Sequence, residues 1–447
     1  MTIAAAKPRH TPFLASFTAE AARAPLRSYA LMLAAWMFDF RASGEGQGLA
    51  VQAVFAVIYL MAFSLFVVGD SGRAMRIHGL GQFMFCAVLF LVTGLASGLA
   101  NGQAIYPLFR NGFSIFVYLT AAYATARIVA VASPGFLRRL LALACLIYGI
   151  AAFFITLLQR GAIDVSQVRF EIVGNSVIAA LAYLTLLLMF RLNRLELGTM
   201  LINFALVFLS VTRTYLIVVL FQALPALQNA RRLFGPRIIV YLLVAAAVIG
   251  TIMVSGQFGV ERWVDRLQNR GSTSGQDITY LTRVSEWQFM WDGFLSSIET
   301  FLFGNGFVAE TVYWIPKEAG GGFEISVGFG HNQYLSMLFT AGFIGAMPLL
   351  VVQLQQAWRA YRFLLAAIRA GRSQSDLLFL GAWGAMIVLG MLSANYLLST
   401  FGSRGASLWF GIGTGMLLGV QAWFDPLNRR LPRRPAPRLH RALPQGA

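Results

Sequence analysis

Long apolar runs separated by short polar and basic segments dominate the chain. Many of these runs approach about 20 residues, the length that a helix needs to cross the hydrocarbon core of a bilayer. The pattern predicts helices at residues 28–40, 48–69, 79–100, 112–132, 139–158, 173–192, 196–211, 214–228, 237–255, 332–356, 376–395 and 403–423. The segment 28–40 is shorter than the roughly 17 residues of a span. The sequence therefore predicts an all-α polytopic membrane protein with about 12 transmembrane segments.

Composition supports this fold class. Of the 447 residues, 58% are hydrophobic and 12% are charged, whereas a soluble domain carries roughly 25% charged residues. The length alone would allow two or three soluble domains, but the apolar runs exclude that organisation. The net charge of +17 lies in short arginine clusters between apolar runs and in a Pro/Arg-rich tail, which indicates a membrane protein and not a nucleic-acid partner.

The distribution of charge predicts an orientation. With both termini in the cytoplasm, the inner segments hold 24 of the 35 basic residues, and the outer segments hold 13 of the 18 acidic ones. This asymmetry follows the positive-inside rule. The predicted divisions are a cytoplasmic tail at 1–27, transmembrane helices at 28–255, an outer loop or cap at 256–331, transmembrane helices at 332–423 and a basic cytoplasmic tail at 424–447. The first tail lacks a signal-peptide core beside a cleavage site.

The outer loop between the ninth and tenth segments is the one long stretch outside the membrane. Loops of this length in a compact protein are usually functional or disordered. Its aromatic residues and short amphipathic patterns, such as 283–294 with Trp287 and Met290 on one face, predict a folded cap. Arg262, Arg266 and Arg270 share one helical face, which suits a structural role through ion pairs or lipid phosphates.

Three residues on the predicted outer face could carry chemistry, and each has a structural alternative. Arg213 interrupts the apolar hairpin 196–228, where a charge is costly, although it could simply anchor the hairpin at the surface. Arg283 could bind an anion or form a surface ion pair with Glu286 or Asp277. His331 stands where the loop re-enters the membrane and could act as a base near neutral pH or cap the following helix.

Together these residues suggest one site. Two guanidinium groups match phosphate oxygens, and a neutral imidazole can accept a proton. This set describes a site in which a diphosphate leaves while a hydroxyl attacks. The sequence shows no acidic metal-binding cluster, so the arginines would stabilise the developing charge. Cys86 and Cys145 lie inside apolar runs and are interpreted as lipid-facing or packing thiols.

Several motifs resemble the superfamily of O-antigen ligases and Wzy-type polysaccharide polymerases. His331-Asn332, nine residues and then Gly342-Phe343-Ile344-Gly345 resemble its His-Asn…Gly-x-x-Gly signature. Segments 282–287 (TRVSEW) and 302–307 (LFGNGF) resemble its Arg-x-x-x-Trp…Leu-x-Gly-x-Gly loop, and Thr212-Arg213-Thr214 stands where the family has Ser-Arg. The motifs cover residues 213–356. Thr212 in place of Ser and Asn305 in place of a small apolar residue depart from the pattern without removing a charge.

The resemblance implies a metal-independent glycosyltransferase of the bacterial inner membrane that needs no cofactor. Such enzymes take a glycan from undecaprenyl diphosphate on the periplasmic side. By this resemblance Arg213 and Arg283 bind the diphosphate, His331 activates the acceptor hydroxyl, and Asn332 orients His331 or the sugar. Trp287 joins the predicted substrate-binding residues, and Gly342 and Gly345 allow close helix packing.

The shared motifs do not separate two activities. We favour a polymerase that lengthens an exopolysaccharide or O-antigen repeat unit over a ligase that transfers the glycan to lipid A–core in lipopolysaccharide synthesis. A transporter of lipid-linked oligosaccharides is the alternative of another class, although it would show inverted repeats and charges along a central path. Membrane lipid is an expected partner, nucleic acid is not, and the cooperation of a flippase and a chain-length regulator stays open.

Overall fold

The computed structural model describes residues 24–37, 49–70, 76–160, 176–210, 214–229, 278–307, 311–314, 324–327, 330–369 and 375–424. Its helices are α2 (Ala24–Met37), α3 (Leu49–Gly69), α4 (Leu80–Ala100), α5 (Ile105–Val131), α6 (Pro134–Arg160), α7 (Val177–Met189), α8 (Arg194–Ser210), α9 (Thr214–Gln228), α13 (Ile278–Phe294), α14 (Ile298–Phe303), α15 (Gln333–Arg369), α16 (Asp376–Ala394) and α17 (Arg404–Phe424), with a 3₁₀ turn η4 (Thr400–Gly402). Two short strands, β1 (Thr311–Trp314) and β2 (Glu324–Val327), pair as an antiparallel hairpin.

The described part of the chain confirms a helical membrane-type fold. Six helices are long and apolar enough to cross a membrane, namely those containing Gln52–Gly69, Leu80–Ala100, Ile105–Val131, Pro134–Phe154, Gln333–Arg369 and Asp376–Ala394. α7 and α9 are apolar but shorter. A continuous helix satisfies its backbone hydrogen bonds within itself, as a lipid environment requires. The predicted helix at 237–255 lies outside the described residues, as do most of both tails and the parts 256–277, 308–310, 315–323 and 328–329 of the predicted outer loop.

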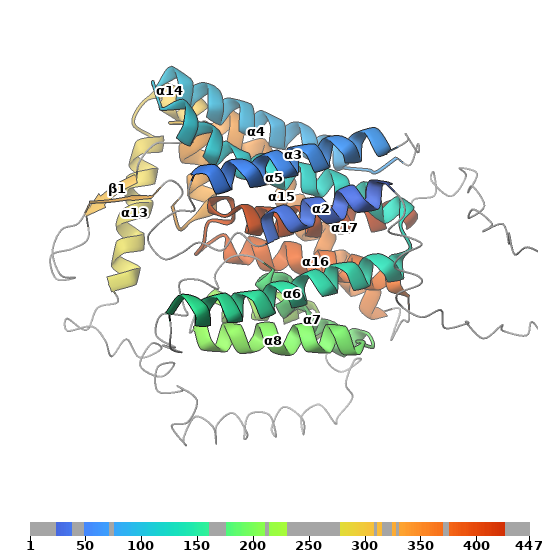
Figure 1. The fold of residues 1–447 in the computed structure, drawn as a ribbon. Helices are drawn as coiled ribbons and strands as arrows, with labels where there is room; N and C mark the ends of the chain where they lie inside the picture. The colour runs from blue at the N-terminus through green and yellow to red at the C-terminus, as the bar shows by residue number, and fades with distance from the viewer. Residues whose placement is uncertain are drawn as a thin grey trace, which may run out of the picture.

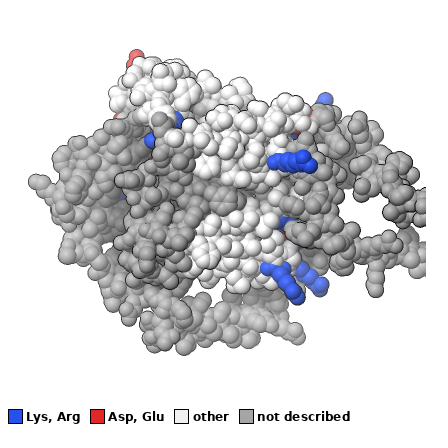
Figure 2. Space-filling model, viewed as in Figure 1, with Lys and Arg blue, Asp and Glu red and all other residues white. Residues whose placement is uncertain are grey.

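The long helices lie side by side (Figure 1). They present apolar side chains on the outside of the bundle. Val68, Phe85 and Leu354 are among the most exposed large apolar residues, with exposed fractions of 84%, 69% and 71%. Figure 2 shows the middle of the visible face without charge, and basic side chains at its right-hand end, where α6 and α8 begin. An apolar belt bordered by arginines suits a bilayer.

α17 is the central helix, and it packs most closely on α5. Gly411, Gly415 and Gly419 form a stripe of small residues at a spacing of four. A Cβ at these positions would lie 2.5, 2.5 and 2.9 Å from the backbone oxygens of residues 118, 122 and 126 on α5. Small residues at this spacing let two helices approach backbone to backbone. The buried cysteines Cys86 and Cys145 confirm the prediction of packing thiols.

The bundle has two ends that differ in chemistry. We call the end where α6, α8 and α16 begin the arginine end, because Arg127, Arg138, Arg139, Arg191, Arg194, Arg362 and Arg369 lie near it. We call the opposite end, where α15 begins after His331 and α16 finishes, the histidine end. α13 crosses the left-hand ends of the long helices in Figure 1, with β1 beside it, and so covers the histidine end.

α15 departs from the predicted helix 332–356 in length and shape. It continues to Arg369, and Gly342 breaks it with φ 63° and ψ −172°. This backbone conformation is essentially restricted to glycine. The break frees two carbonyl groups, and the loop after α14 uses them: the backbone N–H of Asn305 donates to Phe339 O at 2.8 Å, and that of Gly306 donates to Thr340 O at 2.9 Å.

Side chains of α4, α5 and the turn between them hold the other face of this loop. Ser97 Oγ donates to Phe303 O at 2.6 Å, Gln103 Nε2 to Asn305 O at 2.7 Å, and Asn111 Nδ2 to Phe307 O at 2.8 Å. Gly304 (φ 78°, ψ −174°) faces Gly342 directly. The predicted packing role of Gly345 is confirmed, because a Cβ there would lie 2.9 Å from Thr93 Cβ on α4. Gly342, in contrast, acts by breaking the helix.

Alanine at Gly342 should destabilise the protein strongly. Its Cβ would lie 2.5 Å from the backbone nitrogen of Gly304, and its backbone conformation would be strained by ~1–3 kcal/mol before any clash is added. We expect Gly342→Ala to lower the thermal unfolding midpoint of the purified protein in detergent. Gly198→Ala on α8 is the matched control, since nothing lies within 4 Å of that Cβ, and alanine is the better helix former. Equal melting of the two variants would contradict this account of the break.

Candidate functional site

A buried carboxylate holds the histidine at the start of α15. Glu286 Oε2 lies 2.9 Å from His331 Nδ1, and Glu286 Oε1 accepts a hydrogen bond from the backbone N–H of His331, also at 2.9 Å. The side chain of Glu286 is 0% exposed, whereas that of His331 is 39% exposed. The carboxylate therefore fixes both the ring and the backbone of His331, while one edge of the imidazole stays accessible.

Glu286 reaches this position because α13 packs with one face on α15. Glu286, Met290 and Phe294 recur every four residues and are all buried, so they form the inner stripe of the helix. Gly330 is needed opposite this stripe, because a Cβ there would lie 2.6 Å from Glu286 Oε1 and 2.7 Å from Met290 Sδ. The absence of a side chain at residue 330 thus allows the approach of the carboxylate.

Asn332 caps α15 and is itself buried. Its Oδ1 accepts hydrogen bonds from the backbone N–H groups of Tyr334 and Leu335 at 3.0 and 3.1 Å. This is the ordinary N-cap arrangement of asparagine. The alternative in which His331 caps the helix is therefore wrong, and the Asn332 oxygen orients the helix and not the imidazole ring. Gln333 fixes the same turn, because its Oε1 accepts from Ser399 Oγ at 2.9 Å and Phe401 N at 3.0 Å.

The geometry selects one tautomer of His331. An ionised carboxylate can only accept, so Nδ1 carries the proton that is shared with Glu286. Nε2 then presents its lone pair, and it has no partner among the residues that the structure describes. A carboxylate behind an imidazole also stabilises the imidazolium that forms when Nε2 takes a proton. The pair can therefore serve as a general base.

Arg283 and Trp287 flank Glu286 on α13. Arg283 lies one turn before Glu286, and residues three apart on a helix have neighbouring side chains. Its side chain is partly buried, as is that of Trp287. The Trp287 ring lies 5.4 Å from the ring of Tyr396, which follows α16. The structure thus bonds His331 to Glu286 and places Arg283 and Trp287 within one turn of Glu286 on α13.

Arg213 lies outside the described residues, as do Arg262, Arg266 and Arg270. The neighbouring helix ends can be placed. α8 begins at the arginine end, so Ser210 finishes it toward the histidine end. α9 returns from Thr214, because Gln222 Nε2 donates to Met386 O midway along α16 and Gln228 contacts Tyr361 in the second half of α15. The two helix ends that flank residues 211–213 therefore point toward the end that holds His331.

The sequence predicts Glu286 only as a surface ion-pair partner of Arg283, whereas the structure buries it against His331. Its spacing in the sequence does indicate burial, because it shares one face of α13 with the apolar residues Met290 and Phe294. An acidic residue on such a face needs a partner. Within the described part of the chain no group of three or more His, Cys, Asp or Glu side chains could hold a metal ion.

No family model matches the chain, and no curated protein matches it.

Proposed function

We propose that the protein is a membrane glycosyltransferase that transfers a glycan from undecaprenyl diphosphate to a lipid-linked repeat unit, and so lengthens an exopolysaccharide or O-antigen. The Glu286–His331 pair carries the proposal. A buried carboxylate, a partly exposed imidazole bonded to it and an arginine one turn away lie at one end of a bundle of apolar helices. The motif resemblance around residues 282–345 supplies the reaction class.

The proposed reaction is a single displacement. The acceptor hydroxyl oxygen bonds to the anomeric carbon of the donor glycan, and the bond from that carbon to the diphosphate oxygen breaks. His331 Nε2 takes the hydroxyl proton, and Glu286 stabilises the resulting imidazolium. Undecaprenyl diphosphate leaves with the bonding electron pair, and Arg283 and Arg213 stabilise its charge. The donor bond is already activated, so the proposal includes no metal ion and no cofactor.

The proposed setting is the bacterial inner membrane, with about 12 transmembrane segments and both termini in the cytoplasm. The arginine end would then face the cytoplasm and the histidine end the periplasm. The concentration of arginines at one end of the described helices supports this orientation. α13 and the β hairpin would form part of the periplasmic cap at 256–331, which would close over the donor diphosphate.

A gene deletion distinguishes the polymerase from the two alternative activities, a ligase and a transporter. The surface glycan of the deletion strain would be resolved by size, with complementation by wild type or a His331 variant. Single repeat units that still reach the surface would support the polymerase. Long chains that stay on the lipid carrier would instead identify a ligase to lipid A–core. Retention of single repeat units on the inner side of the membrane would identify a transporter.

Glu286→Gln tests the carboxylate. Glutamine places an NH2 donor where one of the two carboxylate oxygens stands, so one of the two His331 groups, the backbone N–H or Nδ1–H, would face a donor. Glutamine also lacks the charge that stabilises an imidazolium. Partners that orient a reacting group in this way typically contribute about 10-fold to 100-fold. We expect glycan elongation in isolated membranes to fall by about that factor, with protein level and melting midpoint recorded alongside.

Glu299→Gln is the matched control, because Glu299 is an exposed residue on α14 at the same end of the molecule. It should leave elongation unchanged. Similar rates for Glu286→Gln and Glu299→Gln would remove the carboxylate from the mechanism.

A further inference from the structure

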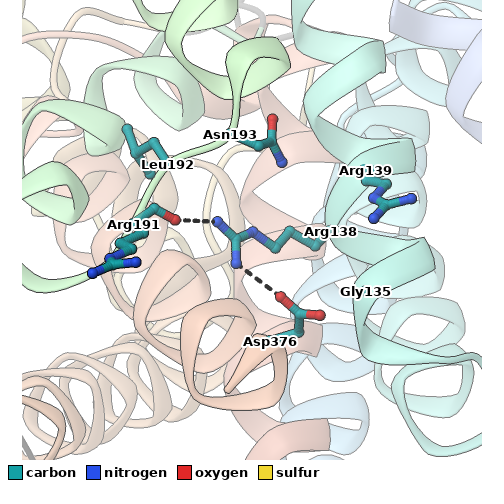
Figure 3. A pocket seen from close by; sticks show the side chains of 7 residues that line it. All are labelled: Gly135, Arg138, Arg139, Arg191, Leu192, Asn193 and Asp376. Carbon is teal, nitrogen blue, oxygen red and sulfur yellow. Dashed lines mark hydrogen bonds and ion pairs between the residues drawn. The ribbon is translucent and has the colours of Figure 1, made fainter. Parts of the chain in front are cut away.

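A cavity of about 250 Å³ opens at the arginine end, far along the helices from His331. Figure 3 shows the residues that line it: Gly135, Arg138, Arg139, Arg191, Leu192, Asn193 and Asp376. They come from the first two turns of α6, the segment before α8 and the start of α16. The proposed transfer reaction does not use this cavity.

Arg138 forms a fixed wall of the cavity. Its guanidinium donates to both oxygens of buried Glu196, to Asp376 Oδ1 at 2.8 Å and to the backbone oxygen of Arg191 at 2.8 Å. The same group lies 3.7 Å over the ring of Phe379. These bonds occupy four of the five N–H donors of an arginine. Arg138 therefore holds the three helix starts together, and its orientation is set before any ligand arrives.

Among the described residues, the lining of the cavity carries more positive than negative charge. Two carboxylates, Glu196 and Asp376, face three guanidinium groups, and both carboxylates are bonded to Arg138. Arg139 and Arg191 are exposed and lie on opposite sides of Arg138 in Figure 3. The N-termini of α6, α8 and α16 also meet here, and helix N-termini carry partial positive charge. The surroundings favour an anion with several oxygen atoms.

Apolar surface continues from this cavity along α6 and α8. The two helices start together and run in parallel, because Thr199 Oγ1 donates to Ala142 O at 3.1 Å and Asn203 Nδ2 to Cys145 O at 3.3 Å. Ile147 on α6 and Leu201 on α8 are exposed. Each lies about eight residues beyond the cavity, a distance of roughly 12 Å along a helix. A phosphate in the cavity would thus lie at the distance of a lipid headgroup from the exposed apolar surface of α6 and α8, which is suited to acyl chains.

We propose that this cavity binds the phosphate group of an anionic phospholipid, whose acyl chains lie on the exposed faces of α6 and α8. Basic pockets between transmembrane helices are suited to acidic lipid headgroups. The apolar surface beside the cavity favours a lipid over a free phosphate ion. Arg139 and Arg191 would contact the phosphate, while Arg138 would position the helix starts. This site goes beyond the proposed transferase function and does not depend on it.

Binding of phosphatidylglycerol to the purified full-length protein tests the proposal. The lipid would be titrated in detergent and counted by native mass spectrometry, with phosphatidylcholine as the neutral comparison. We expect the Arg139→Gln/Arg191→Gln double variant to bind phosphatidylglycerol about 10-fold more weakly or worse. Arg362→Gln/Arg369→Gln is the matched control, because it removes two exposed arginines on α15 near the same end.

The outcomes separate the sources of the anion. Loss in the cavity variant, retention in the control and resistance to excess inorganic phosphate would support the lipid site. Displacement by inorganic phosphate would overturn it in favour of a free-anion site. Equal weakening in both double variants, or equal binding of the two lipids, would overturn it in favour of unspecific attraction. Unchanged melting midpoints would show that the variants fold.

Discussion

His331→Asn is expected to lower glycan elongation by about 100-fold to 10,000-fold, the range contributed by a positioned general base. The asparagine amide nitrogen can take the place of Nδ1 and still donate to Glu286. The variant therefore keeps the partner of the buried carboxylate and removes only Nε2, the atom that would accept the hydroxyl proton. The measurement is the rate of elongation in isolated membranes at equal protein level.

The size of this effect distinguishes catalysis from structure. A residue that only anchors the start of α15 would be replaced by asparagine with a small loss of activity and a shifted melting midpoint. His331→Ala, which leaves the Glu286 side chain with only the backbone N–H of residue 331, should lose activity to the same degree and stability in addition. Near-normal elongation by His331→Asn would mean that the imidazole is not the base.

Arg283→Ala is expected to reduce elongation by about 100-fold or more. One preorganised donor to developing negative charge typically contributes ~3–4 kcal/mol to a transition state. Arg283 lies on the same helix as Glu286, one turn away, and so can reach a diphosphate whose glycan lies at His331. Arg283→Lys should recover part of the loss, because lysine keeps the charge but lacks the two-pronged geometry that matches phosphate oxygens.

Arg110→Ala is the matched control for Arg283→Ala. It is exposed, lies near the start of α5 and belongs to the histidine end, so Arg110→Ala removes a positive charge at a similar depth outside the proposed site. Its elongation rate should stay within about twofold of wild type, as for most surface substitutions. If both alanine variants lost activity equally, the overall charge of that end would matter and not a specific contact from Arg283.

Helix positions followed closely from the apolar pattern. The predicted segments 48–69, 79–100 and 376–395 differ from α3, α4 and α16 by a residue at their ends. A helix in lipid must be continuous and apolar over a fixed length, so its signal is contained in its own residues. α5 extends seven residues before its predicted start because 105–111 holds Arg110 and Asn111, whose polarity hid the first turns.

The features that the sequence did not predict depend on contacts between segments that are distant along the chain. The bond between Glu286 and His331 joins residues 45 apart, and nothing in local periodicity predicts such a pairing. The break at Gly342 depends on the Gly304–Gly306 loop that fills it. The sequence alone therefore predicts only a packing role for Gly342. The arginine-end cavity combines α6, α8 and α16, and its residues look singly like loop arginines of the positive-inside pattern.

Transfer from an isolated donor tests the central claim most directly. Lipid-linked repeat units extracted from a deletion strain would be incubated with membranes that contain wild type or His331→Asn, and both glycan length and released undecaprenyl diphosphate would be measured. The account predicts longer glycans with matching release of undecaprenyl diphosphate for wild type, and neither for His331→Asn. Wild-type membranes that leave the repeat units unchanged, or a His331→Asn variant that elongates them at the wild-type rate, would contradict it.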